Sequence, residues 1–218
     1  RLSLVGSEMC IRDRHRTNIS QSGDIVLMNK LKELRKKIAD DKSIPPYVIF
    51  QDPSLNEMTF RYPISTDELS SIFGVGEGKA KKYGKDFIEL IAKHVEENNI
   101  DRPDEMVVKS AGKNSSLKLF IIQGIDRKLS VEDIAQSKSM QVEELISEME
   151  TIVYSGTKLD LSYCIDDYLD EDQQDELYDY FIESESDDIE QALTEFDGEY
   201  DEFELKLFRI KFLSDLAN

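Results

Sequence analysis

Apolar residues that recur every three or four positions, broken by proline and glycine, constrain the fold of this chain more than any other feature. The first such run extends from Leu27 to Ile38, and Pro45 and Pro46 follow it. Proline has no amide proton and fixes its own backbone, so this pair ends one helix before the next can begin. Similar runs return up to the last residues of the chain. The sequence therefore predicts an all-α protein built from short helices.

Capping residues and glycines place the ends of these helices. Ser65 and Ser130 each stand before acidic residues and an apolar run, which is a helix-start signal. Gly74 is expected to end the short helix after Ser65, and Gly76 or Gly78 to open the next one. The expected helices are 25–40, 66–73, 78–98, 117–123, 131–135, 140–152 and 203–216.

Charge is distributed very unevenly along the chain. Residues 160–218 hold 21 Asp and Glu residues against three basic ones, a net charge of −18 out of −19 for the whole chain. The first 159 residues are therefore close to neutral, and lysine clusters within them can still attract phosphate. The acidic end keeps large apolar residues such as Phe181 and Leu193, which a disordered acidic segment usually lacks. We therefore expect amphipathic helices there.

Cysteine, histidine and hydropathy exclude several classes of protein. Cys10 and Cys164 are too few for a disulfide framework or a cysteine-rich zinc site, and they indicate a reducing interior. His15 and His94 belong to no pattern typical of a metal or catalytic site. No apolar run is long enough to cross a membrane. We expect a cytoplasmic protein in the vicinity of the nucleoid, without a metal site and without a membrane partner.

Two motifs in the front half indicate nucleic-acid binding. The first is Ile44-Pro-Pro-Tyr-Val-Ile-Phe-Gln-Asp52, and the second joins Gly74-Val-Gly76 to the lysine-rich run 79–85. Glycines let backbone amides approach phosphate at a helix N-terminus, and lysines add nonspecific attraction. This part of the chain resembles the HRDC domain, the helicase-and-RNase-D C-terminal module. The resemblance implies a small helical bundle that binds DNA.

The resemblance extends over residues 24–218, which look like the C-terminal end of a bacterial RecQ-type ATP-dependent DNA helicase. It implies an HRDC domain, a linker, a helix-turn-helix domain and an acidic helical tail, at residues 24–100, 101–114, 115–160 and 161–218. No Gly-x-x-x-x-Gly-Lys-Ser/Thr phosphate loop occurs in the sequence, so we expect no ATPase motor in these residues. The resemblance implies 3′-to-5′ unwinding by the parent helicase, with ATP, Mg²⁺ and Zn²⁺ held by other domains and no cofactor held by these residues.

Residues 1–23 are expected to stand apart from the fold. Leu2–Arg14 looks like a translated transposase adapter from a sequencing library, and such scars are set aside before a fold is considered. The alternatives are a flexible tail and a basic arm built from Arg12, Arg14, His15 and Arg16.

The candidate DNA-binding residues come from three places. Tyr47 follows two prolines, where its ring could stack on an unpaired base or pack in the core, and the resemblance favours DNA contact. Gly76 could help to hold phosphate or serve only in a helix-capping turn, and the basic side chains could line a groove or only be solvated. The full set is Lys32, Arg35, Lys36, Tyr47, Gly76, Lys79, Lys81, Lys82 and Lys85.

Three functions stay open from the sequence. The first is an accessory region that engages single-stranded or branched DNA in repair and recombination, while the helicase core of the same polypeptide unwinds it. The second is an acidic interaction or autoregulatory module that docks on a basic partner or on the helicase core. The third is an enzyme of the RNase D class, although its Asp/Glu nuclease motifs are not present in these residues.

The helix at 140–152 would be the one to read the major groove if the helix-turn-helix bound duplex DNA. Its expected exposed positions are Gln141, Glu143, Glu144, Glu148 and Glu150. Glutamates repel phosphate, so we expect packing or partner binding from this helix more than DNA reading.

Overall fold

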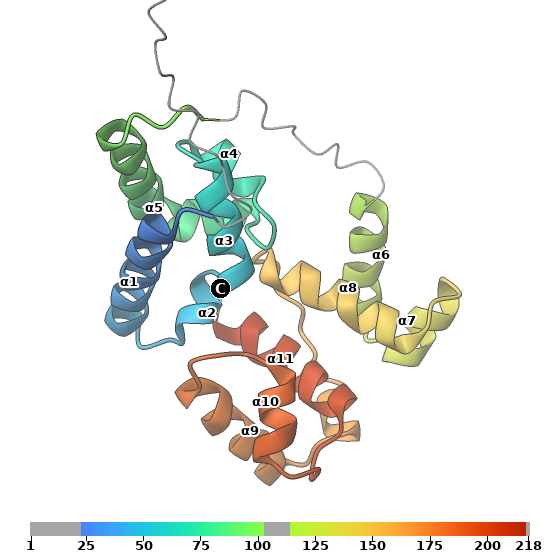
Figure 1. Ribbon diagram of the computed structural model, residues 1–218. Coiled ribbons are helices and arrows are strands. Elements are labelled where there is room, and N and C mark those ends of the chain that lie inside the picture. Colours follow the sequence, from blue (N-terminus) through green and yellow to red (C-terminus); the bar gives the residue numbers. More distant parts are fainter. Residues whose placement is uncertain (1–22, 103–113, 217–218) are drawn as a thin grey trace, which may run out of the picture.

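A computed structural model describes residues 23–102 and 114–216, and within them it contains eleven α-helices, one 3₁₀ turn and no strand (Figure 1). The predicted all-α class is confirmed. The expectations for residues 1–22, and for residues 103–113 of the linker predicted at 101–114, lie outside the described residues. The helices are α1 Ile25–Lys42, α2 Pro46–Ile49, α3 Asp52–Arg61, α4 Thr66–Ser70, α5 Glu77–Glu97, α6 Asn114–Asp126, α7 Val131–Ser137, α8 Val142–Tyr154, α9 Glu171–Glu183, α10 Ile189–Glu195 and α11 Glu202–Leu216.

The front domain comprises α1 to α5, and the two long helices α1 and α5 pack against each other and against the short ones. Phe50 lies in the middle of its core, with its ring edge-on to Phe87 at a centroid distance of 4.9 Å. Edge-to-face pairs of this kind add to the stabilisation from apolar burial. The predicted break at Pro45-Pro46 is present, because α1 ends at Lys42 and α2 begins at Pro46. Proline suits the first position of a helix, where its missing amide costs no hydrogen bond.

The caps predicted from serine are also present. The Ser65 hydroxyl accepts from the Glu68 amide at the start of α4, and the Ser130 hydroxyl accepts from the Asp133 amide at the start of α7. Gly74 adopts a left-handed conformation with φ of 72°, but α4 ends earlier, at Ser70. Three residues, Ser71 to Phe73, therefore separate the end of α4 from Gly74.

The middle domain comprises α6, α7 and α8, in the short helix-turn-helix arrangement that the sequence predicts. The acidic tail (residues 161–218) follows as α9, α10 and α11, with a 3₁₀ turn at Ile165–Asp167. The predicted amphipathic helices are confirmed there, since Leu177 and Phe181 of α9 are fully buried while its acidic residues are mostly exposed.

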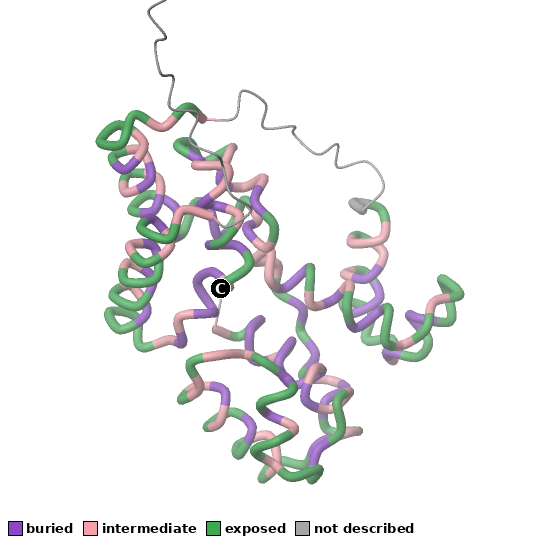
Figure 2. The backbone as a smooth tube through the Cα atoms, viewed as in Figure 1, coloured by how far each residue is buried: buried purple, intermediate pink, exposed green. Residues whose placement is uncertain are grey.

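One apolar core joins the acidic tail to the rest of the molecule. It runs from α6 to α8 and on through α9 to α11, and it also includes Tyr47 and Val48 of α2. A separate core fills the front domain. Figure 2 shows buried segments in α2, α8 and α11, where the front domain, the middle domain and the tail meet. Tyr47 and Phe181, which are 134 residues apart in the sequence, thus pack together at this junction.

Candidate nucleic-acid interface

Tyr47 lies at the junction of the front domain and the acidic tail. Its side chain is 3% exposed, and its hydroxyl donates a hydrogen bond to the backbone carbonyl of Phe181 at the end of α9. Burial is the main cause that raises the pKa of Tyr47, so the hydroxyl stays protonated and acts as a donor. The sequence favours a ring that projects into solvent to contact DNA, but in the structure the ring is buried. Contact of Tyr47 with DNA stays a prediction, and it requires the tail to move.

Gly76 and Lys79 lie where the front domain meets the end of α8. A Cβ at Gly76 would stand 1.9 Å from the carbonyl oxygen of Ser155, which is far inside van der Waals contact. Lys79 is 2% exposed, and its ammonium donates to the carbonyl of Val48 at 2.8 Å. In this arrangement Gly76 provides close packing, and the charge of Lys79 points into the protein. Both residues could reach phosphate only if α8 moved away.

The three basic residues of α1 face the acidic tail across open clefts. Lys32 and Arg35 help to line a cleft of about 1050 Å³, and Lys36 helps to line another of about 410 Å³. Lys32 and Arg35 each form an ion pair of 2.7 Å with Asp52. Burial alone would raise the pKa of Asp52, but the hydrogen bonds from Lys32 and Arg35 lower it, so the carboxylate stays ionised and holds both cations. The guanidinium of Arg35 also donates to Phe50, and only 8% of this residue is exposed.

Lys81, Lys82 and Lys85 are exposed on the outer face of α5, as the sequence predicts. Lys81 forms an exposed ion pair with Glu77 at 2.6 Å. The ammonium of Lys82 lies 5.3 Å from the centre of the Tyr83 ring, and that of Lys42 approaches the same ring to 5.8 Å. The end of α1 and the start of α5 thus bring their lysines together around Tyr83. We call Lys42, Lys81, Lys82 and Lys85 the α5 basic surface.

The structure therefore divides the predicted residues into three settings. The residues exposed to solvent are Lys81, Lys82 and Lys85. Those that line the clefts beside the tail are Lys32, Arg35 and Lys36. Those that pack at domain junctions are Tyr47, Gly76 and Lys79. The burial of Lys79 could have been recognised from the sequence. It stands four residues before Tyr83 and eight before Phe87 on the buried face of α5, so the helical period places it inward.

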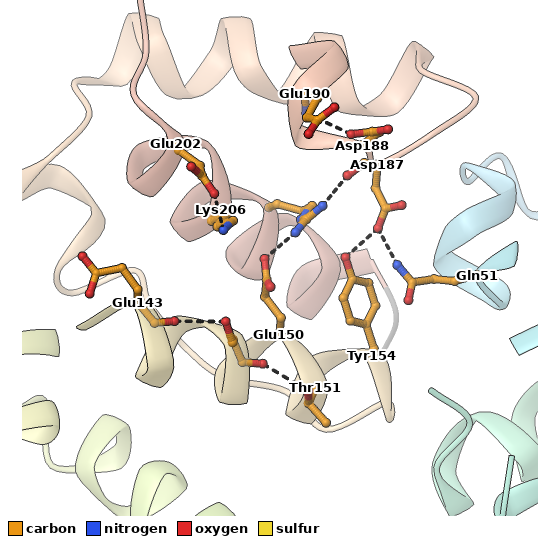
Figure 3. A network of polar contacts seen from close by, with 12 residues as sticks. Gln51, Glu143, Glu150, Thr151, Tyr154, Asp187, Asp188, Glu190, Glu202 and Lys206 are labelled. Atoms are coloured by element: carbon orange, nitrogen blue, oxygen red, sulfur yellow. Dashed lines mark hydrogen bonds and ion pairs between the residues drawn. The ribbon is translucent and has the colours of Figure 1, made fainter. Parts of the chain in front are cut away.

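Asp187 connects all three parts of the molecule at one point (Figure 3). Its carboxylate accepts hydrogen bonds from the Gln51 amide at 2.8 Å and from the Tyr154 hydroxyl at 2.6 Å. Its backbone carbonyl accepts from Arg209 of α11, and the guanidinium of Arg209 also binds Glu150 of α8. The expectation that Glu150 is an exposed residue of α8 is wrong, because its carboxylate is turned inward to this arginine. Asp187 and Gln51 could not be found from the sequence, since 136 residues separate them.

His94, for which the sequence analysis finds no partner, is buried and bonded at the far end of α5. Its Nε2 lies 2.7 Å from the carboxylate of Asp24, and the same carboxylate caps α1 by accepting from the Leu27 amide at 2.9 Å. Burial would raise the pKa of Asp24, but the bonds from Leu27 and His94 lower it overall. This pair ties the first residue of the front domain to its last helix. The described residues contain no group of three or more His, Cys, Asp and Glu side chains that could hold a metal ion.

The exposed face of α8 is acidic, with Glu143 and Glu144 in its first turn. The opposite face carries Leu145, Met149 and Ile152, which are buried against the neighbouring helices. No helix of the described ranges is long and apolar enough to cross a membrane. The geometry of α8 favours packing between domains, and its charge does not favour an approach to phosphate.

Comparisons with known proteins match the front and middle domains to two families. Residues 24–91 match the HRDC domain, and residues 115–165 match the RecQ-1-like helix-turn-helix domain. The chain is 46% identical over 65 residues to the ATP-dependent DNA helicase RecQ of Bacillus subtilis, and 44% identical over 68 residues to that of Haemophilus influenzae. It is 32% identical over 68 residues to the ATP-dependent DNA helicase UvrD2 of Mycobacterium bovis.

Each of these alignments covers only a short part of the relative. The matched segments make up 30%, 31% and 31% of this chain, and 11%, 11% and 10% of the three helicases, respectively. The chain thus matches about a tenth of the length of the curated relatives. The HRDC match covers α1 to α4 and α5 as far as Ile91, and the helix-turn-helix match covers α6 to α8 from residue 115. Helices α9 to α11 lie outside both matches.

Proposed function

We propose that this chain, which carries the HRDC and helix-turn-helix domains of the RecQ helicase family, is the accessory DNA-binding region of a RecQ-type helicase. It would hold single-stranded or branched DNA while the helicase core, as part of the same polypeptide, unwinds it 3′-to-5′ in repair and recombination. ATP, Mg²⁺ and Zn²⁺ would belong to that core and the domain next to it. The proposal assigns none of them to the described residues.

The observation that carries the proposal is the α5 basic surface. Its lysines are exposed and come from two helices that pack against each other, so their charges add at one place on the molecule. Lysine ammonium groups attract the phosphates of any nucleic acid without reading its sequence. The acidic total charge of the chain does not oppose this attraction strongly, because exposed charges more than about 8 Å apart are largely screened at physiological salt.

The middle domain contributes support to this interface. Gly76 at the start of α5 packs against Ser155 at the end of α8, so α8 helps to fix the direction in which α5 presents its lysines. The acidic face of α8 would repel phosphate, and we assign no base reading to it. A region of this kind gives modest, salt-dependent affinity and little preference for sequence.

The test is a titration of fluorescent oligo-dT with the full chain, with anisotropy as the readout. The variant Lys81→Gln/Lys82→Gln/Lys85→Gln removes three charges from the α5 basic surface. We expect it to bind at least tenfold more weakly, and the slope of log affinity against log salt to fall by about 2 for three lost phosphate contacts. The control Lys93→Gln/Arg127→Gln/Lys128→Gln makes the same change in charge at exposed residues elsewhere. Equal loss in both variants would contradict the proposal.

A further inference from the structure

The acidic tail covers the aromatic residue of the front domain that is best suited to stack on a base. The Tyr47 ring shares one apolar core with Phe181, Phe208 and Phe212 of the tail. Its hydroxyl is bonded to the backbone of Phe181, so the polar end of the side chain is satisfied as well. Only 3% of Tyr47 is exposed, so its ring cannot stack on a base while α9 stays in place.

A second contact closes the same junction a few residues further along. The segment between α9 and α10 places Asp187 against Gln51, which directly follows the core residue Phe50 at the end of the first motif. The bond from Tyr154 to the same carboxylate and the bond from Arg209 to the backbone of Asp187 hold this segment in position (Figure 3). The contact between the tail and the front domain is therefore built from specific polar bonds as well as apolar burial.

Charge on the two sides of the junction is complementary. The larger cleft is lined by Lys32, Arg35 and their ion-pair partner Asp52 from the front domain, and by Arg209 and several acidic residues from the tail, namely Glu185, Asp187, Asp188, Glu190 and Glu202. In the smaller cleft Lys36 faces Glu183 and Glu185. The carboxylates of the tail thus lie near the cations of α1 that a DNA backbone would need. A phosphate chain that entered these clefts would meet repulsion from the tail until the tail moved away.

We infer that the acidic tail is an autoinhibitory cover, which closes over Tyr47 and the cations of α1 in the DNA-free chain and competes with single-stranded DNA for this surface. The inference rests on the proposed DNA-binding function. Only the fraction of molecules in which the tail has moved away can bind DNA at this surface. The measured association constant is therefore the intrinsic association constant multiplied by that fraction. Any substitution that destabilises the closed state and keeps the aromatic ring at position 47 should therefore strengthen the binding of single-stranded DNA.

Tyr47→Phe makes that change, since it keeps the ring and removes the hydroxyl that binds Phe181. Gln51→Ala breaks the bond to Asp187 without altering charge, and Asp187→Ala breaks it from the side of the tail. We expect full-length Tyr47→Phe and Gln51→Ala each to bind fluorescent oligo-dT about two- to tenfold more tightly than the wild type, the fold-change that corresponds to one lost hydrogen bond. Asp187→Ala also loses the bond from Tyr154, so its affinity should rise by at least as much. Asp179→Ala is the matched control, because it removes the same charge from an exposed site on α9 and should leave the affinity as it is.

Hydrogen exchange measured by mass spectrometry gives a readout that does not depend on variants. Saturating oligo-dT should increase exchange in residues 181–190 of the wild type and decrease it in residues 44–52. If oligo-dT binds but Tyr47→Phe and Gln51→Ala match Asp179→Ala in affinity, and exchange in residues 181–190 stays unchanged, the cover is refuted and the proposed function stands. If oligo-dT binds neither the wild type nor any variant, the proposed function fails together with the inference.

Discussion

Gly76 approaches the backbone carbonyl oxygen of Ser155 so closely that a Cβ at this position would stand 1.9 Å from it. On the other side of the same contact, Gly156 has a φ of 85° and faces the side chain of Lys79. Glycines on both chain segments therefore let the front and middle domains touch through their backbones. The glycine motif that the sequence analysis connects with phosphate serves, in this structure, to bring two domains together.

Gly76→Ala should destabilise the protein, because backbone atoms on both sides must move to make room for the new methyl group. We expect the free energy of unfolding to fall by about 1–3 kcal/mol, measured by urea denaturation. Gly78→Ala is the matched control two residues later, where the nearest atom to a new Cβ is 3.5 Å away. That change should leave stability unaltered or raise it by up to about 1 kcal/mol. Equal effects of the two substitutions would show that the domains do not meet at Gly76.

Lys79 should make stability depend on pH in the alkaline range. Burial lowers the pKa of Lys79 to about 8, although the charge of Asp187 partly opposes this shift. In the unfolded chain its pKa is about 10.4. Between these two values the unfolded state binds more protons than the folded state, so the free energy of unfolding rises with pH.

The comparison with Lys79→Met isolates this contribution, because methionine does not titrate. The free energy of unfolding of the wild type, relative to Lys79→Met, should rise by roughly 3 kcal/mol from pH 7 to pH 10.5. Urea denaturation of both proteins at intervals across this range gives the difference directly. A difference that stays constant with pH would contradict the buried, bonded position of the ammonium.

Asp24→Ala removes both the cap of α1 and the partner of His94. Loss of a capping side chain costs about 0.5–2 kcal/mol, and the unpaired histidine nitrogen should add to this loss. Because the pKa of Asp24 is lowered in the folded state, its contribution is present above the unfolded pKa of about 3.9 and is lost as the pH falls through the folded value. The difference in the free energy of unfolding between the wild type and Asp24→Ala, measured by urea denaturation, should therefore become smaller below about pH 4. Asp41→Ala, at an exposed site near the other end of α1, should cost much less.

Arg209→Met should be among the most damaging single substitutions in the tail. It leaves the half-buried carboxylate of Glu150 without its partner, which costs about 3–5 kcal/mol in buried pairs of this kind. The double variant Arg209→Met/Glu150→Met should recover most of the loss, as thermal unfolding can show. Lys206→Met on the same helix breaks only the pair with Glu202 and should change stability by less than about 0.5 kcal/mol. No recovery in the double variant would mean that Glu150 and Arg209 are not coupled.

Local signals in the sequence were sufficient to predict most helices and their order. The caps at Ser65 and Ser130 and the break at Pro45-Pro46 depend on neighbours within a few residues, which a single sequence displays directly. The resemblance to the HRDC domain, based on two motifs, is confirmed by the match over residues 24–91.

The packing of the tail could not be predicted in the same way. Tyr47 and Phe181 are 134 residues apart, and no periodicity within either segment indicates that the two side chains meet. A tyrosine after two prolines looks the same whether its ring is exposed or covered by a distant helix. Predictions of helix position were thus reliable where the cause was local, and predictions of exposure failed where a distant helix decided it.

A titration of fluorescent oligo-dT with the full chain determines whether this protein binds single-stranded DNA. A blunt duplex of the same length, labelled in the same way, is titrated in parallel from about 50 to 200 mM salt. We expect saturable binding of the single strand that is tighter than binding of the duplex and that weakens with salt by about 0.7 in log-log slope for each phosphate contacted. Absence of binding to the single strand even at the lowest salt would show that this chain is not a DNA-binding region.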